Sequence, residues 1–242
     1  MATSIKVCKN TDELSQFFAQ YIISRINACA EGDFFSIALS GGSTPMAIFQ
    51  YLTANYRVSI PWHRLLVFWS DERCVAPDDQ ESNYRMTKEN LLNQVPIALE
   101  NIFRIKGEND PAEEAEEYAS IVKQFVPSTN DIPQFDLIML GLGEDGHTAS
   151  IFPESLQLFY SEKLFVVAEH PLTRQQRITA TGTLINNSKA VVFIVTGKSK
   201  SKIVRLVIDQ ESENRHLPAS LVNPEKGELL WLLDEEAAGI II

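Results

Sequence analysis

Cysteine is scarce in this 242-residue sequence, which contains only Cys8, Cys29 and Cys74. The number is odd, and no two of them have the spacing of a metal site, so we expect reduced, structural thiols. This scarcity argues against a disulfide-stabilised scaffold and against a cysteine-ligated metal.

Long apolar runs are also missing. No stretch of about 18 apolar residues occurs, and the first ten residues, MATSIKVCKN, lack the apolar segment of a signal peptide. The sequence therefore predicts a protein that neither spans a membrane nor is exported, and the expected location is cytoplasmic.

Basic residues are in deficit: 21 Lys and Arg stand against 32 Asp and Glu, which gives a formal net charge of −11. A chain this acidic repels nucleic acid and anionic membranes, so neither is an expected partner. An anionic small molecule can bind only where local cations and backbone amides outweigh the overall field. The few Arg and Lys residues near glycine-rich loops are therefore the informative ones.

Apolar runs of strand length alternate with segments of helical periodicity. The strand candidates are 5–8, 34–40, 65–70, 135–141, 164–169, 178–181, 190–197 and 228–234, and the helix candidates are 11–30, 45–52, 81–93, 111–126 and 199–209. Strands this continuously apolar predict an α/β fold in which helices cover both faces of a mostly parallel sheet. We expect one domain, 1–242, with ligands bound at the carboxyl ends of the strands.

Four unusual segments follow predicted strands, and the first is SGGSTP. It contains Gly41, Gly42, Ser43 and Thr44 and precedes a helix that we expect to begin at Pro45. Free N–H groups and the helix dipole at such a turn favour an anion. The alternative is a tight turn in which Ser or Thr merely caps the helix. The segment matches neither a serine-hydrolase elbow nor a P-loop.

The second segment is SDER, in which Arg73 can bind a phosphate through two N–H groups and Asp71 can orient a sugar hydroxyl or a cation. Its alternative is a solvated loop with an internal ion pair. Two further cations complete the set of candidates: Arg177 lies beside a predicted strand, and Lys200 lies in TGKSK, the last of the four segments. Each of these two side chains, taken alone, is ordinarily solvated.

The third segment, GLGEDGH, formally matches the dinucleotide-binding pattern. Pro153 follows too soon for the required helix, and no strand ending in an acidic residue lies at the right spacing, so we do not expect NAD. What remains is a glycine-rich loop that presents Asp145 and His147. Neutral histidine is the natural base for activating water near pH 7; the alternative is a histidine that hydrogen-bonds only within its loop.

In chain order, these segments together with ESNYRM, RITAT and GELLWLLDEEAA resemble the 6-phosphogluconolactonase family of the sugar-phosphate isomerase-like superfamily. The resemblance implies a Rossmann-like fold and hydrolysis of 6-phosphoglucono-1,5-lactone in the oxidative pentose phosphate pathway. It implies a phosphorylated sugar lactone as substrate, without a metal or an organic cofactor. It leaves open whether the protein is a monomer or a dimer.

The resemblance assigns roles to the candidate residues. It implies that His147 is the general base and that the loop Gly41–Thr44 and Arg73 contact the substrate or its phosphate. Arg177 and Lys200, rather than Lys198, match the later cationic positions.

The nearest alternative is glucosamine-6-phosphate deaminase, which resembles the chain less. That enzyme has a glutamate where this sequence has Phe152, and usually a tyrosine where this sequence has Arg73. A third possibility is a sugar-phosphate sensor without catalytic activity.

Overall fold

The computed structural model describes residues 2–209 and 216–239. The strands are β1 (Ala2–Cys8), β2 (Phe35–Leu39), β3 (Leu65–Trp69), β4 (Asp71–Arg73), β5 (Ser128–Thr129), β6 (Ile132–Pro133), β7 (Leu137–Leu140), β8 (Phe165–Glu169), β9 (Gln176–Ala180), β10 (Ala190–Val195) and β11 (Glu228–Asp234). The α-helices are α1 (Thr11–Ala28), α2 (Ser43–Asn55), α3 (Asn83–Thr87), α4 (Pro111–Phe125), α5 (Gly182–Asn186), α6 (Ser201–Ile208) and α7 (Glu235–Ala238).

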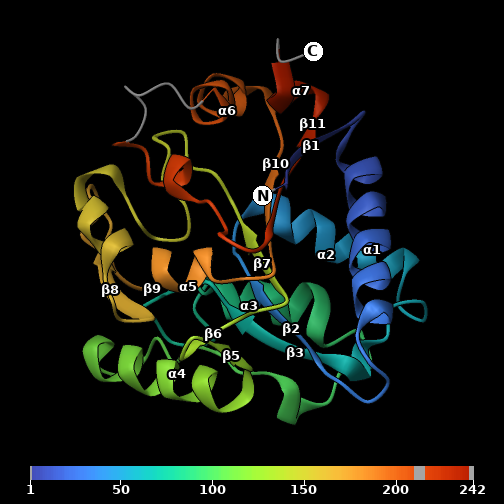
Figure 1. Ribbon diagram of the computed structural model, residues 1–242, viewed down its shortest axis with the longest axis horizontal. Coiled ribbons are helices and arrows are strands. Elements are labelled where there is room, and N and C mark those ends of the chain that lie inside the picture. The colour runs from blue at the N-terminus through green and yellow to red at the C-terminus, as the bar shows by residue number, and fades with distance from the viewer. Residues whose placement is uncertain (1, 210–215, 240–242) are drawn as a thin grey trace.

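A six-stranded parallel sheet forms the centre of the molecule, in the order β1-β11-β10-β7-β2-β3. Every residue of β2, β3, β7 and β10 is buried, as expected for strands covered on both faces. In Figure 1, α1 and α2 lie to one side of this sheet, and α5 lies to the other. The predicted α/β class is confirmed.

Two of the predicted strands belong to a second sheet. β8 and β9 pair with each other and with β4 in an antiparallel sheet of order β4-β9-β8. The alternative in which SDER is a solvated loop with an internal ion pair is therefore wrong. The chain bends at Ser70 and continues as β4, in which the Asp71 and Glu72 side chains are buried, with residue exposures of 5% and 3%.

The start of α2 also differs from the prediction, since the helix begins at Ser43 and not at Pro45. Proline is tolerated anywhere in the first turn, because those N–H groups have no acceptor within the helix. Gly42 occupies the N-cap position with φ of 108°, and no side chain in the described part of the chain caps the helix. The alternative in which Ser or Thr caps this turn is therefore wrong, and the first amides of α2 lack side-chain acceptors.

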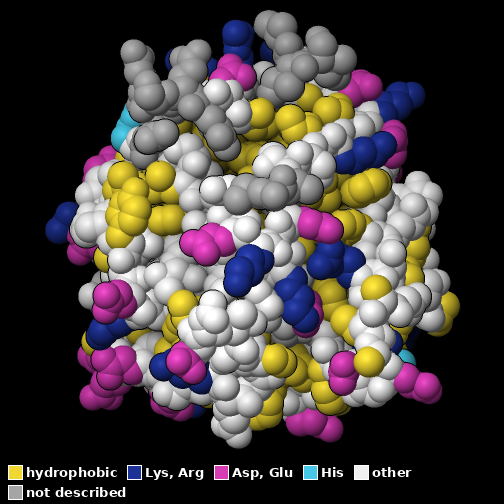
Figure 2. Space-filling model, in the orientation of Figure 1, with side chains coloured by type: hydrophobic (Ala, Val, Ile, Leu, Met, Phe, Trp, Pro, Cys, Tyr) yellow, Lys and Arg dark blue, Asp and Glu magenta, His cyan; other side chains and the backbone are white. Residues whose placement is uncertain are grey.

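Within the described residues, no helix has the length and apolar character needed to cross a membrane. Figure 2 shows Lys and Arg side chains interspersed with Asp and Glu on one face of the molecule. On that face the acidic side chains are therefore spread among basic ones and do not form one acidic block.

Candidate active site

A cavity of about 210 Å³ lies where the loops after β2, β3, β7 and β10 converge. Its lining residues are Ser40, Gly41, Gly42, Asp71, Arg73, Asn83, Gly141, Leu142, Gly143, His147, Ala149, Arg177 and Lys200. Most of the residues singled out in the sequence therefore share one cavity at the carboxyl edge of the parallel sheet. Ser43, Thr44 and Asp145 do not line it.

His147 and Asp145 form a hydrogen-bonded pair, with 2.6 Å between Nδ1 and Oδ1. The same Oδ1 accepts the backbone N–H of His147 at 3.1 Å. Burial alone would raise the pKa of Asp145, but its bonds to His147 and the charge of that ring lower the pKa to about 2. Because an ionised carboxylate can only accept, Nδ1 of His147 donates, and Nε2 of the neutral ring is left as the basic nitrogen.

The ring of His147 is held between backbone and an aromatic side chain. A Cβ added at Gly143 would collide with Nδ1 of His147 and with Oδ1 of Asp145. The ring of Phe152 packs 4.7 Å from the His147 ring, centroid to centroid. Gly143 therefore serves close packing of the pair, a role that its place in a GxGxxG-like pattern does not reveal.

The turn before α2 offers backbone donors to the cavity. No hydrogen bond among the described residues uses the backbone N–H of Gly41, Gly42, Ser43 or Thr44. The hydroxyl of Thr44 is engaged by that of Thr196 at 2.7 Å, so Thr44 joins this turn to the end of β10. Free amides at the start of a 13-residue helix favour an anion.

Arg73 and Arg177 face each other directly across β4 and β9. Like charges in this position destabilise a sheet. Neither guanidinium has a carboxylate within 4.0 Å in the described part of the chain, and Nε of each is buried without a hydrogen-bond partner. Burial, and then the charge of Arg73, lower the pKa of Arg177 against an opposing effect of Asp71. The pair is arranged to receive an anion.

Asp71 is tied into the wall of the cavity. Its Oδ2 accepts the hydroxyl of Ser150 at 2.6 Å, and Nδ2 of Asn83 donates to its backbone oxygen at 2.9 Å. Nη1 of Arg177 reaches the same Ser150 oxygen at 3.4 Å. Asp71 thus supports neighbouring side chains, and the proposed contact with a sugar hydroxyl stays a prediction.

Glu72 was not recognised from the sequence, yet it positions two cavity residues. Its buried carboxylate accepts the backbone N–H of Arg73, Asn83 and Tyr84 and the hydroxyl of Ser82. Burial raises its pKa, although these N–H groups act in the opposite direction. Asn83 itself was also missed. The sequence offers one clue to Asn83: the preceding Ser82 is a residue type that caps helices, and its hydroxyl does cap α3.

Lys200 lines the cavity and Lys198 does not, in keeping with the preference for Lys200. Both lie in a short 3₁₀ turn, Lys198–Lys200, that follows Gly197 with φ of 93°. The carboxylate of Asp234 fixes this turn by accepting the N–H of Gly197 at 3.0 Å.

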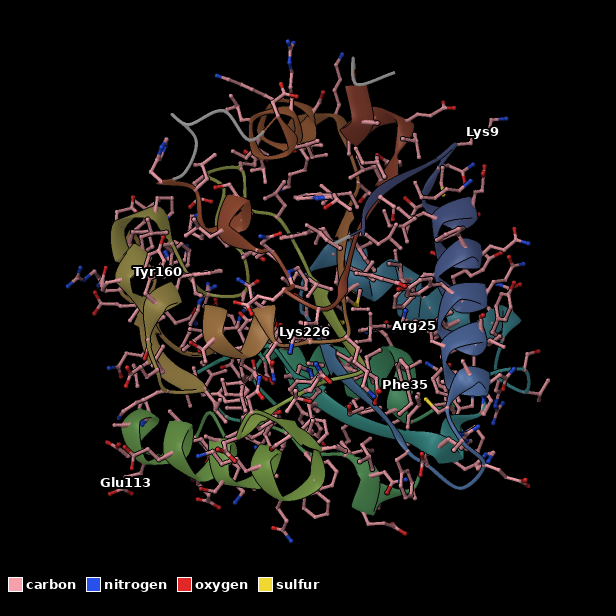
Figure 3. All side chains as sticks on the ribbon, in the orientation of Figure 1. Lys9, Arg25, Phe35, Glu113, Tyr160 and Lys226 are labelled. Carbon is pink, nitrogen blue, oxygen red and sulfur yellow. The ribbon has the colours of Figure 1, made fainter. Side chains whose placement is uncertain are left out.

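A larger cavity, of about 800 Å³, opens elsewhere, near Arg25 on α1 and Phe35 at the start of β2, both labelled in Figure 3. Its cations are already paired: Arg25 with Glu228 at 2.9 Å and Lys189 with Asp136 at 2.8 Å. It contains no histidine and lies at the opposite ends of the strands. We therefore assign the chemistry to the smaller cavity.

No group of three or more His, Cys, Asp and Glu side chains in residues 2–209 and 216–239 is arranged to hold a metal ion. The donors that converge on the smaller cavity are instead one imidazole, three cationic side chains and backbone amides. This set suits an anionic organic molecule with an electrophilic or acidic centre near the imidazole.

Comparisons with known proteins identify the family of the chain and its relatives. The protein family described as "Glucosamine-6-phosphate isomerases/6-phosphogluconolactonase" matches residues 9–231. The chain is 38% identical to a 6-phosphogluconolactonase of Synechocystis over 98% of both chains, and 38% identical to one of Haemophilus influenzae over 95% of this chain and 94% of the other. A crystal structure of 6-phosphogluconolactonase from Leishmania guyanensis superposes with a TM-score of 0.88 at 29% identity, covering both chains completely.

Proposed function

Because the chain belongs to the glucosamine-6-phosphate isomerase and 6-phosphogluconolactonase family, we propose that it hydrolyses 6-phospho-D-glucono-1,5-lactone to 6-phospho-D-gluconate. This is a reaction of the oxidative pentose phosphate pathway, and we place the enzyme in the cytoplasm. One observation supports the proposal above all: a carboxylate-held imidazole shares a cavity with two arginines that have no ionic partner among the described residues. The imidazole suits hydrolysis of an ester, and the two arginines suit binding of a phosphate.

The phosphate of the substrate binds among Arg73, Arg177, Lys200 and the free amides of Gly41–Thr44. Guanidinium groups and helix N-terminal amides are both favourable partners of phosphate oxygens. Binding there relieves the repulsion between the two arginines and fixes the lactone ring relative to His147. Fixed orientation of the reacting groups lowers the entropic part of the barrier.

His147 then acts as a general base. Nε2 takes a proton from a water molecule while the water oxygen bonds to C1 of the lactone, and the carbonyl oxygen gains the negative charge. Backbone N–H groups of a glycine loop stabilise that oxyanion. When the tetrahedral intermediate collapses, the C1–O5 bond breaks, and the imidazolium returns the proton to O5, which becomes the 5-hydroxyl. Asp145 keeps the ring in the required tautomer throughout.

The proposal is tested by following acid release in a pH-stat with fresh 6-phosphogluconolactone and with unphosphorylated gluconolactone. After subtraction of spontaneous hydrolysis, we expect turnover of the phosphorylated lactone and little of the other. His147→Ala should lower kcat/KM by about 10²–10⁴-fold, the usual contribution of one general base. His63→Ala, at an exposed histidine outside the cavity, is the control and should behave as the wild type. Full activity of His147→Ala would contradict the mechanism.

Deaminase chemistry is tested in parallel by ammonia release from glucosamine 6-phosphate. The position where the deaminases have a glutamate is Phe152, whose ring packs against His147. An apolar ring cannot accept a hydrogen bond from the imidazole as a carboxylate can. We therefore expect no ammonia above background, and steady ammonia release would assign the chain to the other branch of the family.

A further inference from the structure

A second imidazole, that of His170, packs against Phe152 and is not itself one of the residues that line the cavity. The Phe152 side chain is fully buried and contacts three groups: the His147 ring at 4.7 Å, the Arg177 guanidinium at 5.6 Å and the His170 ring at 5.1 Å. His147 and Arg177 belong to the site already described. His170 has so far been given no role.

The strand register brings His170 to the same face as the arginines. Ala168 on β8 pairs with Arg177 on β9, and the N–H of His170 donates to the carbonyl of Gln175 at 2.9 Å. Side chains alternate along a strand, so His170 and Arg177 are diagonal neighbours on one face. Arg73 lies directly opposite Arg177 on the next strand. One face of this small sheet therefore carries two guanidinium groups and an imidazole.

The protonation of His170 follows from its hydrogen bonds. Its Nδ1 accepts the backbone N–H groups of Leu172 and Thr173, each at 3.2 Å. An accepting Nδ1 carries no proton, so the neutral ring carries its proton on Nε2. Burial, together with the positive charge of Arg177, lowers the pKa of His170 and favours this neutral form. No hydrogen bond among the described residues uses Nε2, which is therefore an available donor.

We propose that His170 is a substrate-binding residue whose Nε2–H donates a hydrogen bond to the phosphate held by Arg73 and Arg177. This proposal rests on the proposed function. A phosphate has more acceptor sites than two guanidinium groups satisfy. A further cation on this face of the small sheet would add to the repulsion within the empty pair, whereas a neutral imidazole supplies a donor without adding charge.

Two substitutions separate this role from a purely structural one. In His170→Asn, Oδ1 takes the place of Nδ1 and keeps the acceptor for the Leu172 and Thr173 amides, while the Nε2 donor is lost. In His170→Gln, the amide nitrogen takes the place of Nε2, while the acceptor for the loop is lost. The pair of variants thus divides the two functions of one ring between two side chains.

The experiment measures kcat and KM of wild type and both variants with 6-phosphogluconolactone and with unphosphorylated gluconolactone, alongside thermal unfolding. For His170→Asn we expect KM for the phosphorylated lactone to rise about tenfold, as for loss of a hydrogen bond to a charged acceptor, with kcat and Tm retained. Its kinetics with the unphosphorylated lactone should not change. His170→Gln should keep KM closer to the wild type and lower Tm.

Wild-type KM in His170→Asn would overturn the proposal and leave His170 as a loop cap only. An equal loss with both lactones would also overturn it, because the contact would then not be to phosphate. Calorimetric titration with inorganic phosphate keeps the test independent of turnover. If the wild type hydrolyses neither lactone, the proposed function fails, but weaker phosphate binding by His170→Asn would still support this contact.

Discussion

Adding one methyl group at Gly143 should disable the site while the fold persists. The added Cβ would stand 2.1 Å from Nδ1 of His147, whereas ordinary contact begins at 3.4 Å, so the ring or the loop must move by about 1.3 Å. The φ of Gly143 is not positive, so alanine can adopt its backbone conformation and the effect is purely steric. A misplacement of about 1 Å at a catalytic group can cost about 10²-fold, and we expect a loss of at least that size in kcat/KM.

The crowding should also cost stability, by about 1–3 kcal/mol for a methyl forced into a packed region. In a chain of this length that lowers Tm by roughly 2–12 °C, which thermal unfolding followed by circular dichroism measures directly. Lactone hydrolysis in a pH-stat measures the activity of the still-folded variant at 20 °C or below.

Gly141→Ala is the matched comparison, on the same loop and with the same added methyl. Its Cβ would have only the Ser40 hydroxyl within reach, at 4.0 Å. His147 and Asp145 should stay in place, so kcat should be retained and any loss should be confined to KM. The reasoning fails if Gly143→Ala keeps the wild-type kcat, or if both variants lose kcat equally.

Two further predictions concern charge. Arg73→Ala should raise KM roughly tenfold or more with a smaller change in kcat, because the phosphate is expected to be bound alike in ground and transition states. Inorganic phosphate should raise the Tm of the wild type more than that of the variant. Equal shifts in Tm would exclude Arg73 from the anion site. The pKa of Asp145 lies at about 2, below its ordinary value of 3.8, so the stability it contributes is present above pH 4 and is lost as the pH falls through 2. Denaturant titrations of wild type and Asp145→Asn should therefore differ more at pH 5 than at pH 2.5, and a gap that widens toward acid would contradict the pairing.

The parallel sheet was predictable from the sequence because its strands are buried on both faces and so appear as continuous apolar runs. Strand β4 was not predictable, because its residues are Asp, Glu and Arg and so form no apolar run. What makes Asp71–Arg73 a strand is pairing with β9, about a hundred residues later, and no local pattern reports such a partner. The start of α2 was misplaced for a local reason, since proline fits several positions of a first helical turn.

The site residues likewise fall into those that could be predicted from the sequence and those that could not. His147, Arg73 and the glycine turn directly follow apolar strands, so the topology alone sends them to one edge. Asn83 reaches that edge from a short helix, and His170 packs against Phe152 from a hairpin; both placements depend on tertiary contacts. Glu72 is a buried acidic residue whose hydrogen-bond donors are provided by the folded chain, so its role could not be inferred from its neighbours in sequence.

The opposed guanidinium groups of Arg73 and Arg177 have a consequence for selectivity. In the proposed function they bind a phosphate group without regard to what it is attached to, so other phosphorylated metabolites of similar size, and free phosphate itself, should compete for the same place. We therefore expect discrimination among sugars to arise at the end of the 210 Å³ cavity where His147 lies. A cell rich in such metabolites would slow this enzyme by occupancy alone, with no dedicated regulatory site.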